Sequence, residues 1–278
     1  MSQQTEKANP AHYALITVIA LMAIAPVYIM IMTSFKNQVD MFSQTPIWFF
    51  VPTLDNYSAV LFDKKFDRYL FNSLFVAILS TFLTLSLGGA AAYAIARRNF
   101  WGKSFISYGN LMIRMVPPAV IAVPVFTLWS RWGFNGRYEE LWGLVLFYTA
   151  LNLPFAIWLL FSFVKQIPED LEEAAIVDGA TPFQVFRLVI FPLMKSGYAV
   201  AAIFTFRIAW NEFLLALFLT GRNARTLPVA IQGFLTDEGV EWGRIMAMGT
   251  LVVIPSLIIT FFAARQIITG LTAGAVKG

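Results

Sequence analysis

Cysteine is absent from this sequence of 278 residues and histidine occurs once, so two of the commonest sources of protein chemistry are missing. Without cysteine the chain forms no disulfide and offers no thiol nucleophile or thiolate metal ligand. His12 precedes the first long apolar run, which leaves the apolar segments without a histidine for metal binding or proton relay. A phosphate loop of the form G-x-x-x-x-G-K-[ST] is also absent. We therefore expect no catalytic residue, no metal site and no cofactor in this chain.

Charge is scarce as well, and its scarcity indicates a membrane protein. Charged residues make up 13% of the sequence and hydrophobic residues 58%, against about 25% and 45–50% in soluble domains. The formal net charge of +4 is spread along the chain without a basic stripe, which argues against nucleic acid as a partner.

Six charge-poor runs are long enough for helices that cross a bilayer, which takes about 20 residues. They cover residues 13–35, 69–96, 104–130, 141–164, 196–221 and 245–264. The first run is too long for a signal peptide and has no small-residue cleavage site behind it, so we expect it to be retained. The sequence thus predicts an all-α, polytopic membrane protein with six transmembrane helices. A tail of residues 1–12 precedes a single transmembrane domain over 13–278, which includes a polar loop at 165–195 and a tail at 265–278.

Six spans place both ends of the chain on one side of the membrane, but charge does not identify the side. Nine lysines and arginines fall on each side, so the positive-inside rule gives no answer. The short turn from Arg97 to Lys103 carries three of these cations and weakly favours the inside.

The most informative segment is the polar loop between the fourth and fifth runs, because its residues predict two short helices. Pro168 suits a first helical position, and the acidic residues after it complement the helix dipole. Gly179 can end that helix in a left-handed turn. Thr181 and Gln184 have the spacing of a capping box, which starts a second helix.

One face of the first short helix is small and smooth. Leu171, Ala174, Ala175 and Asp178 recur at helical spacing, so they form a ridge that suits a groove on another protein. Capping and amphipathicity alone are also compatible with an ordinary acidic surface loop.

The loop resembles the EAA loop of ABC-importer permeases, whose pattern is Glu-Ala-Ala, three residues, Gly, nine residues and Ile-x-Leu-Pro. Glu173, Ala174, Ala175, Gly179 and Pro192 fit this pattern, while Val189 and Phe191 replace its Ile and Leu. In that family the loop carries a coupling helix that inserts into a cleft on a cytoplasmic ATPase subunit. The resemblance implies ATPase-coupling roles in this loop for Glu172, Glu173, Ala174, Ala175, Asp178, Gly179, Ala180 and Pro192.

Other motifs resemble the maltose-type carbohydrate permeases. They are Asn72-Ser-Leu-Phe-Val, Gly89-Ala-Ala-Ala-Tyr-Ala-Ile-Ala-Arg97, Met115-Val-Pro-Pro118 with Pro124, Trp210-Asn-Glu-Phe213, Thr226-Leu-Pro-Val229 and Gly270-Leu-Thr-Ala-Gly-Ala-Val-Lys-Gly278. The last resembles the terminal peptide of the second permease, which reaches the ATPase dimer interface. The resemblance therefore implies that Ala273, Gly274 and Lys277 also contact the ATPase. From their composition alone, we expect residues 270–278 to be too flexible to form a helix.

Polar residues inside the apolar runs are candidates for a substrate pathway, because a charge in the bilayer centre is costly. They are Arg114, Asn152, Arg207, Asn211 and Glu212. Arg207 and Asn211 share a helix face, whereas Glu212 lies about 140° around from Arg207. Glu212 can instead pair with Arg114 across helices. Helix packing and pairing with a partner permease are equally compatible roles for these residues, and Asn152 can satisfy local backbone near Pro154.

The resemblance implies a permease subunit of an ABC importer that moves a carbohydrate or carbohydrate derivative inward by alternating access. The implied partners are a homologous permease, two ATPase subunits that bind ATP and Mg²⁺, and a solute-binding protein that meets residues 222–244. The implied location is the inner membrane of a bacterium, with both termini cytoplasmic. An ion-coupled carrier that uses Arg114, Arg207 and Glu212 is the main alternative. A membrane enzyme lacks any supporting set of residues.

Overall fold

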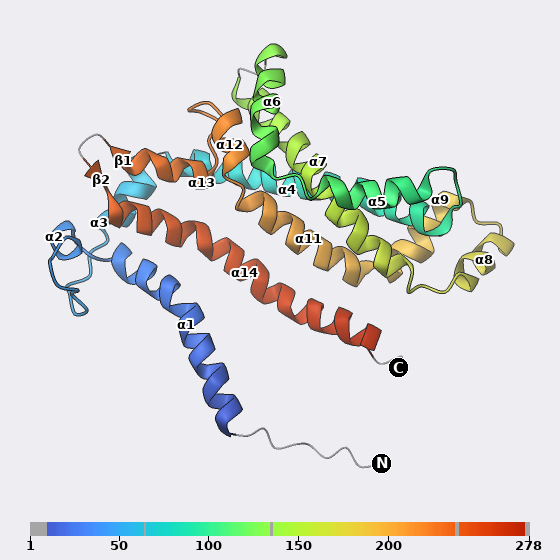
Figure 1. Cartoon of the computed structure of the whole chain (residues 1–278), viewed down its shortest axis with the longest axis horizontal. Helices are drawn as coiled ribbons and strands as arrows, with labels where there is room; N and C mark the ends of the chain where they lie inside the picture. Colours follow the sequence, from blue (N-terminus) through green and yellow to red (C-terminus); the bar gives the residue numbers. More distant parts are fainter. Residues whose placement is uncertain (1–9, 64, 134–135, 237–238, 276–278) are drawn as a thin grey trace. The chain divides into compact units, whose positions relative to one another are not determined.

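Figure 1 shows the chain as a computed structural model, in which residues 10–63, 65–133, 136–236 and 239–275 are described. Helices dominate, as expected from the long apolar runs. The chain divides into two compact units. The first unit is Met1–Phe66 with Ile231–Val253, and the second is Asp67–Ala230 with Ile254–Gly278.

The first unit contains one long apolar helix, several short elements and a small hairpin. Its elements are α1 (Pro10–Ser34), α2 (Gln38–Met41), α3 (Asp55–Ser58), the π-helix η1 (Ala59–Asp63), the 3-10 helix η3 (Ile231–Phe234), β1 (Leu235–Thr236), β2 (Gly239–Val240) and the start of α14 (Trp242–Ala275). The strands are antiparallel, with Leu235 opposite Val240. The Asn56 amide donates hydrogen bonds to the carbonyls of Ser34 (3.0 Å) and Lys36 (2.9 Å), which fixes the turn after α1.

The second unit holds the remaining long helices and the polar loop. Its elements are α4 (Phe66–Arg97), α5 (Lys103–Ile113), α6 (Pro118–Arg131), α7 (Arg137–Val164), α8 (Asp170–Val177), α9 (Pro182–Gln184), the π-helix η2 (Val185–Ile190), α10 (Phe191–Leu193), α11 (Lys195–Trp210), α12 (Leu214–Leu219) and α13 (Leu227–Ala230).

The structure divides two of the six predicted spans. Within the described residues, α1, α4, α7 and α14 are long and apolar enough to cross a membrane, and a fifth span results if 182–193 and α11, bent by 77°, count as one. The predicted third span is two helices, α5 and α6, and the predicted fifth span is α11 followed by the short α12. Six continuous helices are therefore not what this chain forms.

Both divisions have a local cause. Pro117 takes an extended conformation (ψ 137°) and Pro118 starts α6 at its first turn, because a residue before proline is driven out of the helical region. The other break follows Trp210. There the Asn211 N–H makes the last helical bond of α11, to the Arg207 carbonyl, and the Glu212 carboxylate accepts from Leu215 and Ala216 at the start of α12.

Two adjacent glycines let α4 approach its neighbours closely, as their small size predicts. A methyl group added at Gly88 would lie 3.2 Å from the Ala156 side chain of α7. A methyl group at Gly89 would overlap the Tyr198 hydroxyl of α11. Toward the polar loop the same helices enclose an apolar cluster of Ala92, Ala96, Leu160, Val164, Val185, Ile190, Met194 and Ala201.

The C-terminal segment departs from the prediction of a flexible tail. Helix α14 continues to Ala275, so the stretch from Gly270 is helical up to that residue, including Ala273 and Gly274. Alanine is the strongest helix former, and extending an existing helix is easier than starting one. Lys277 lies outside the described residues.

Candidate functional site

The turn that ends α8 is built as the sequence predicts. Gly179 has a φ of +85°. Its N–H donates to the Ile176 carbonyl and the N–H of Ala180 donates to the Ala175 carbonyl, both at 3.0 Å. These bonds form a Schellman motif, which closes the carbonyl end of a helix through a left-handed residue. The helix itself starts at Asp170, later than Pro168 suggested.

The second short helix begins with the predicted capping box. The Thr181 N–H donates to Gln184 Oε1 (2.8 Å), and the Gln184 N–H donates to Thr181 Oγ1 (3.4 Å). The chain continues through η2 into α10, where Pro192 is exposed. The polar loop is therefore two capped helical segments joined by a sharp turn.

The exposed side of α8, which points away from the rest of the chain, carries acidic and apolar groups. Glu173, Ala174, Asp178 and Gly179 are exposed. Two residues that sequence reasoning missed extend this surface, since Ile176 and Val177 are 58% and 86% exposed. Two other residues of the predicted coupling set face inward, because Ala175 and Ala180 pack against the apolar cluster.

Glu172 is a correction to the predicted coupling surface. Only 8% of the residue is exposed, and its carboxylate accepts hydrogen bonds from Tyr93 Oη (2.8 Å) and Arg97 Nε (2.5 Å) of α4. Glu172 therefore attaches the loop to α4. It does not belong to the exposed surface of the loop. The coupling role of Glu172 was implied by the resemblance alone; of the face predicted from helical spacing, Leu171, Ala174 and Asp178 are exposed.

Arg97 is the central residue of this inner network, and sequence reasoning gave it no site role. Besides Glu172, its guanidinium donates to Glu169 Oε1 (3.3 Å) and to the carbonyls of Val164 (3.1 Å) and Ile167 (2.6 Å). Its side chain is 7% exposed. One planar guanidinium with five donors can bridge several acceptors at once, so Arg97 joins the ends of α4 and α7 to the start of α8.

The candidate pathway residues divide into an interior group and an exposed group. Glu212 accepts a hydrogen bond from Tyr148 Oη (2.6 Å) and caps the first turn of α12 through the N–H groups of Leu215 (2.9 Å) and Ala216 (3.2 Å). Buried Asn152 donates to the Tyr148 carbonyl (2.8 Å), which is the local backbone role expected for it.

The predicted pairing of Arg114 with Glu212 is wrong. The Arg114 guanidinium lies 4.4 Å from the centroid of the Phe155 ring, while Glu212 is engaged by Tyr148 and α12. The break after α5 places Arg114 beside the α7 aromatic ring. Arg114, Arg207 and Asn211 are all exposed on the surface of this chain.

A second polar network lies at the other end of α4, around the loop after α12 (Figure 1). The Asn72 amide donates to the carbonyls of Asn223 (3.1 Å) and Arg225 (2.9 Å), and Asn72 Oδ1 accepts from Arg137 Nη2 (2.9 Å). Arg68 Nη1 donates to Asn223 Oδ1 (2.8 Å). Arg137 Nε also donates to Asn72 Oδ1 (3.2 Å). The loop backbone makes two more bonds, from the Leu227 N–H to Ser73 Oγ (2.8 Å) and from the Gly221 N–H to Glu140 Oε2 (2.8 Å).

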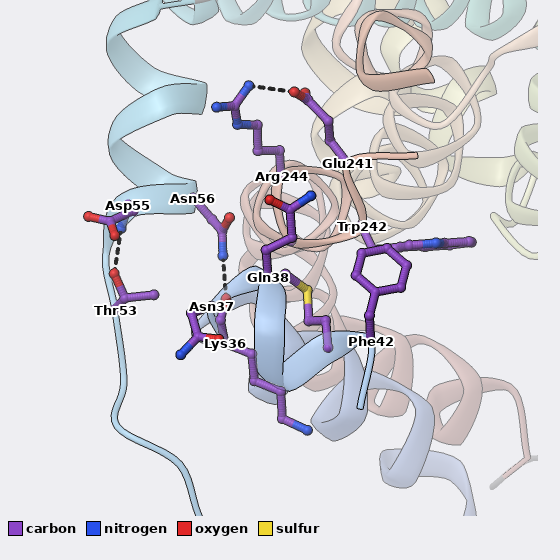
Figure 2. Close-up of a pocket in the computed structure, with 12 residues that line it drawn as sticks. Lys36, Asn37, Gln38, Phe42, Thr53, Asp55, Asn56, Glu241, Trp242 and Arg244 are labelled. Carbon is purple, nitrogen blue, oxygen red and sulfur yellow. Dashed lines mark hydrogen bonds and ion pairs between the residues drawn. The ribbon is translucent and has the colours of Figure 1, made fainter. Parts of the chain in front are cut away.

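A pocket of about 250 Å³ occurs in the first unit, between the turn after α1 and the start of α14 (Figure 2). Trp242 and Phe42, 45% and 60% exposed, supply ring surfaces. The Gln38 amide and the Glu241–Arg244 ion pair (2.7 Å) supply polar groups. Such a lining can hold a small polar ligand or a side chain of another protein. Within the described residues no three His, Asp or Glu side chains are grouped to hold a metal.

Comparison with known proteins identifies the family. A family model described as "Binding-protein-dependent transport system inner membrane component" matches residues 84–272. The trehalose transport system permease protein SugB of Mycobacterium tuberculosis is 41% identical over 229 residues, covering 81% of this chain and 82% of that protein. The trehalose/maltose transport system permease protein MalG of Thermococcus litoralis is 36% identical over 263 residues, covering 93% of each chain.

The fold is that of solved importers. A bacterial ABC transporter involved in the import of the acidic polysaccharide alginate contains a chain that is 19% identical, with a TM-score of 0.77 over 92% of this chain and 94% of that one. This likeness confirms the predicted all-α, membrane-spanning permease fold. The chain is a multi-pass permease subunit of an ABC importer, not an enzyme, and it belongs to the family of binding-protein-dependent transport system inner membrane components.

Proposed function

We propose that this permease moves a carbohydrate or carbohydrate derivative into the cell by alternating access. Support comes from relatives named for trehalose and for trehalose with maltose, at 41% and 36% identity. In this proposal the chain pairs with a homologous permease and receives substrate from a solute-binding protein. Two copies of an ATPase bind ATP and Mg²⁺ and supply the energy.

One observation carries the proposal, namely the surface of α8 that points away from the rest of the chain. Glu173, Ala174 and Asp178 are exposed beside the Gly179 turn, and the helix behind them is fastened to α4 through Glu172. An exposed, capped helix on a rigid support is suited to enter a cleft on the ATPase. Pro192 and the terminal residues Ala273, Gly274 and Lys277 complete the proposed contact.

The same proposal fixes the orientation of the chain. If α8 meets a cytoplasmic ATPase, both termini are cytoplasmic and residues 222–244 face outward toward the binding protein. The pocket of Figure 2 contains Glu241 and Arg244 and then belongs to the outer face.

The exposed polar residues fit a pathway shared between two permeases better than a carrier within one chain. Arg114, Arg207 and Asn211 lie on the surface of this chain, and intramembrane charges need protein or water beside them. A second permease would supply both. Glu212 is engaged in holding α12, which removes one of the three residues on which an ion-coupled carrier would depend.

Co-purification from the native membrane tests the class of transporter. We expect a tagged permease to retain an ATPase and a second permease in mild detergent, and to transport sugar in proteoliposomes only with ATP and the binding protein. Transport driven by an ion gradient without ATP would refute the proposal. Titration calorimetry of the cognate binding protein against sugars, polyols and sugar derivatives then identifies the substrate.

A further inference from the structure

The two polar networks of the second unit are attached to opposite ends of one helix. Asn72 and Arg97 are 25 residues apart on α4, which corresponds to about 38 Å at 1.5 Å per residue. The helix contains no proline between them. One network holds the loop at 221–227 and the other holds the loop at 164–172.

At the inner end the attachment is buried and charge-paired. Arg97 donates to two carboxylates and two backbone carbonyls, and its side chain is 7% exposed. A buried ion pair is costly to separate, because each partner would be left as an uncompensated charge. The loop is therefore expected to move with the end of α4.

At the outer end the attachment is mainly to the backbone, with one bond from Arg68 Nη1 to the Asn223 side chain (2.8 Å). Asn72 and Ser73 hold the carbonyls of Asn223 and Arg225 and the N–H of Leu227. Both α4 residues are buried. Three hydrogen bonds from adjacent residues fix the path of the loop and leave the Arg222 side chain exposed.

We propose that α4 is a rigid strut that links the outer loop at 221–227 to the inner loop at 164–172, with Asn72, Arg97 and Glu172 as its positioning residues. Movement imposed on the outer loop by a docked binding protein reaches the ATPase-facing helix α8 through this strut. The inference rests on the proposed function, which assigns partners to the two loops. It adds the element and the residues that connect them.

Distance measurements on the assembled transporter test the rigid body directly. The chain has no cysteine, so a spin label attached to an introduced cysteine meets no competing native cysteine in this chain. Ser86 on α4, Asp170 at the start of α8 and Arg222 in the outer loop are exposed positions. We expect the Ser86–Asp170 and Ser86–Arg222 distances to stay the same between the nucleotide-free and ATP-bound complexes. A change of more than about 3 Å, twice the rise of a helical residue, in either distance would overturn the strut.

Substitutions test whether the attachments transmit. In the reconstituted complex, Arg97→Gln and Asn72→Asp should each reduce stimulation of ATP hydrolysis by the loaded binding protein roughly tenfold, a change of about 1.4 kcal/mol. Basal hydrolysis should stay within about twofold, since the ATPase-facing surface of α8 is untouched. Arg98→Gln is the matched control, because Arg98 is exposed and makes none of these bonds.

The outcomes separate this inference from the proposed function. Full stimulation in Arg97→Gln would reject Arg97 as a positioning residue and, with it, the strut. A wild-type complex that the binding protein fails to stimulate would instead reject the proposed function. If Arg97→Gln does not assemble, Arg97→Lys keeps the charge but loses the forked geometry, and it should show an intermediate loss of stimulation. Arg97→Lys at the wild-type level would reject the guanidinium bridge.

Discussion

The inner and outer ends of α4 hold their loops by different means. At the inner end Arg97 binds the side-chain carboxylates of Glu169 and Glu172 and also two backbone carbonyls. At the outer end Asn72 binds two backbone carbonyls of the loop, and Arg68 binds the side chain of Asn223 in the same loop. Hydrogen bonds to the backbone leave most loop side chains available for recognition. Bonds to the carboxylates of α8 instead fix the orientation of that helix. Under the proposed orientation, the first kind of contact suits a loop that meets a binding protein and the second suits a helix that meets an ATPase.

The largest effect at the inner loop is expected from removing the left-handed turn that ends α8. Gly179→Val places a β-branched residue at a φ of +85°, which costs about 1–3 kcal/mol of strain. We expect stimulated ATP hydrolysis to fall by about tenfold or more, while membrane insertion and binding-protein affinity are retained. Gly179→Asn is the control, because asparagine tolerates this region. Normal stimulation in the valine variant would remove the turn from the coupling mechanism.

The same substitution at each end compares the two networks. Glu172→Gln breaks a buried ion pair, whereas Glu140→Gln retains an oxygen that can accept from the Gly221 N–H. We expect losses of stability of about 1.5–3 kcal/mol for the first and about 0.5–1.5 kcal/mol or less for the second. Thermal unfolding of the purified complexes measures both. Equal losses would mean that the two ends do not differ in the way described.

A double-mutant cycle tests the region between the two ends. Glu212→Leu removes the cap of α12 and leaves the Tyr148 hydroxyl without its acceptor, for an expected loss of about 1–3 kcal/mol. Arg114→Leu removes a cation–π contact, at about 0.5–2 kcal/mol. Because the two residues have separate partners, the double mutant should be additive within about 0.5 kcal/mol. A coupling energy above that value would restore the Arg114–Glu212 pair.

The smallest expected effect concerns the second helix of the inner loop. Thr181→Ala removes the side-chain half of the capping box, which costs about 1 kcal/mol. Stimulated ATP hydrolysis should fall less than in Gly179→Val, and Thr181→Ser should behave as the wild type. A loss equal to that of the valine variant would show that the cap, and not the turn, limits coupling.

Local features of the loop were predictable from the sequence, because their causes lie within a few residues. The positive φ of Gly179 and the Thr181–Gln184 capping box are confirmed. Both depend on backbone geometry that glycine, threonine and glutamine favour by themselves. The division of the third predicted span was also signalled, since Pro117 and Pro118 together disfavour a continuous helix.

Contacts between distant segments were not predictable in the same way. Arg97 and Glu172 are 75 positions apart, and no local pattern states that they meet. One signal for Glu172 was available in its spacing. It lies three residues before Ala175, so the two share a helix face, and Ala175 packs inward. Glu212 was misassigned because its acceptor role depends on α12 starting two residues later, at Leu214, inside a run that looked like one continuous span.

The close contact at Gly89 limits how α4 can move during transport. A screw movement of α4 by one residue, about 1.5 Å along the axis with about 100° of rotation, would bring Ala90 in one direction and Gly88 in the other to the position that faces Tyr198. The hydroxyl already occupies the volume of a β-carbon at Gly89, so the Tyr198 ring has to shift whenever Ala90 takes that position. Movement of α4 past α11 in that direction is therefore coupled to the rotamer of Tyr198.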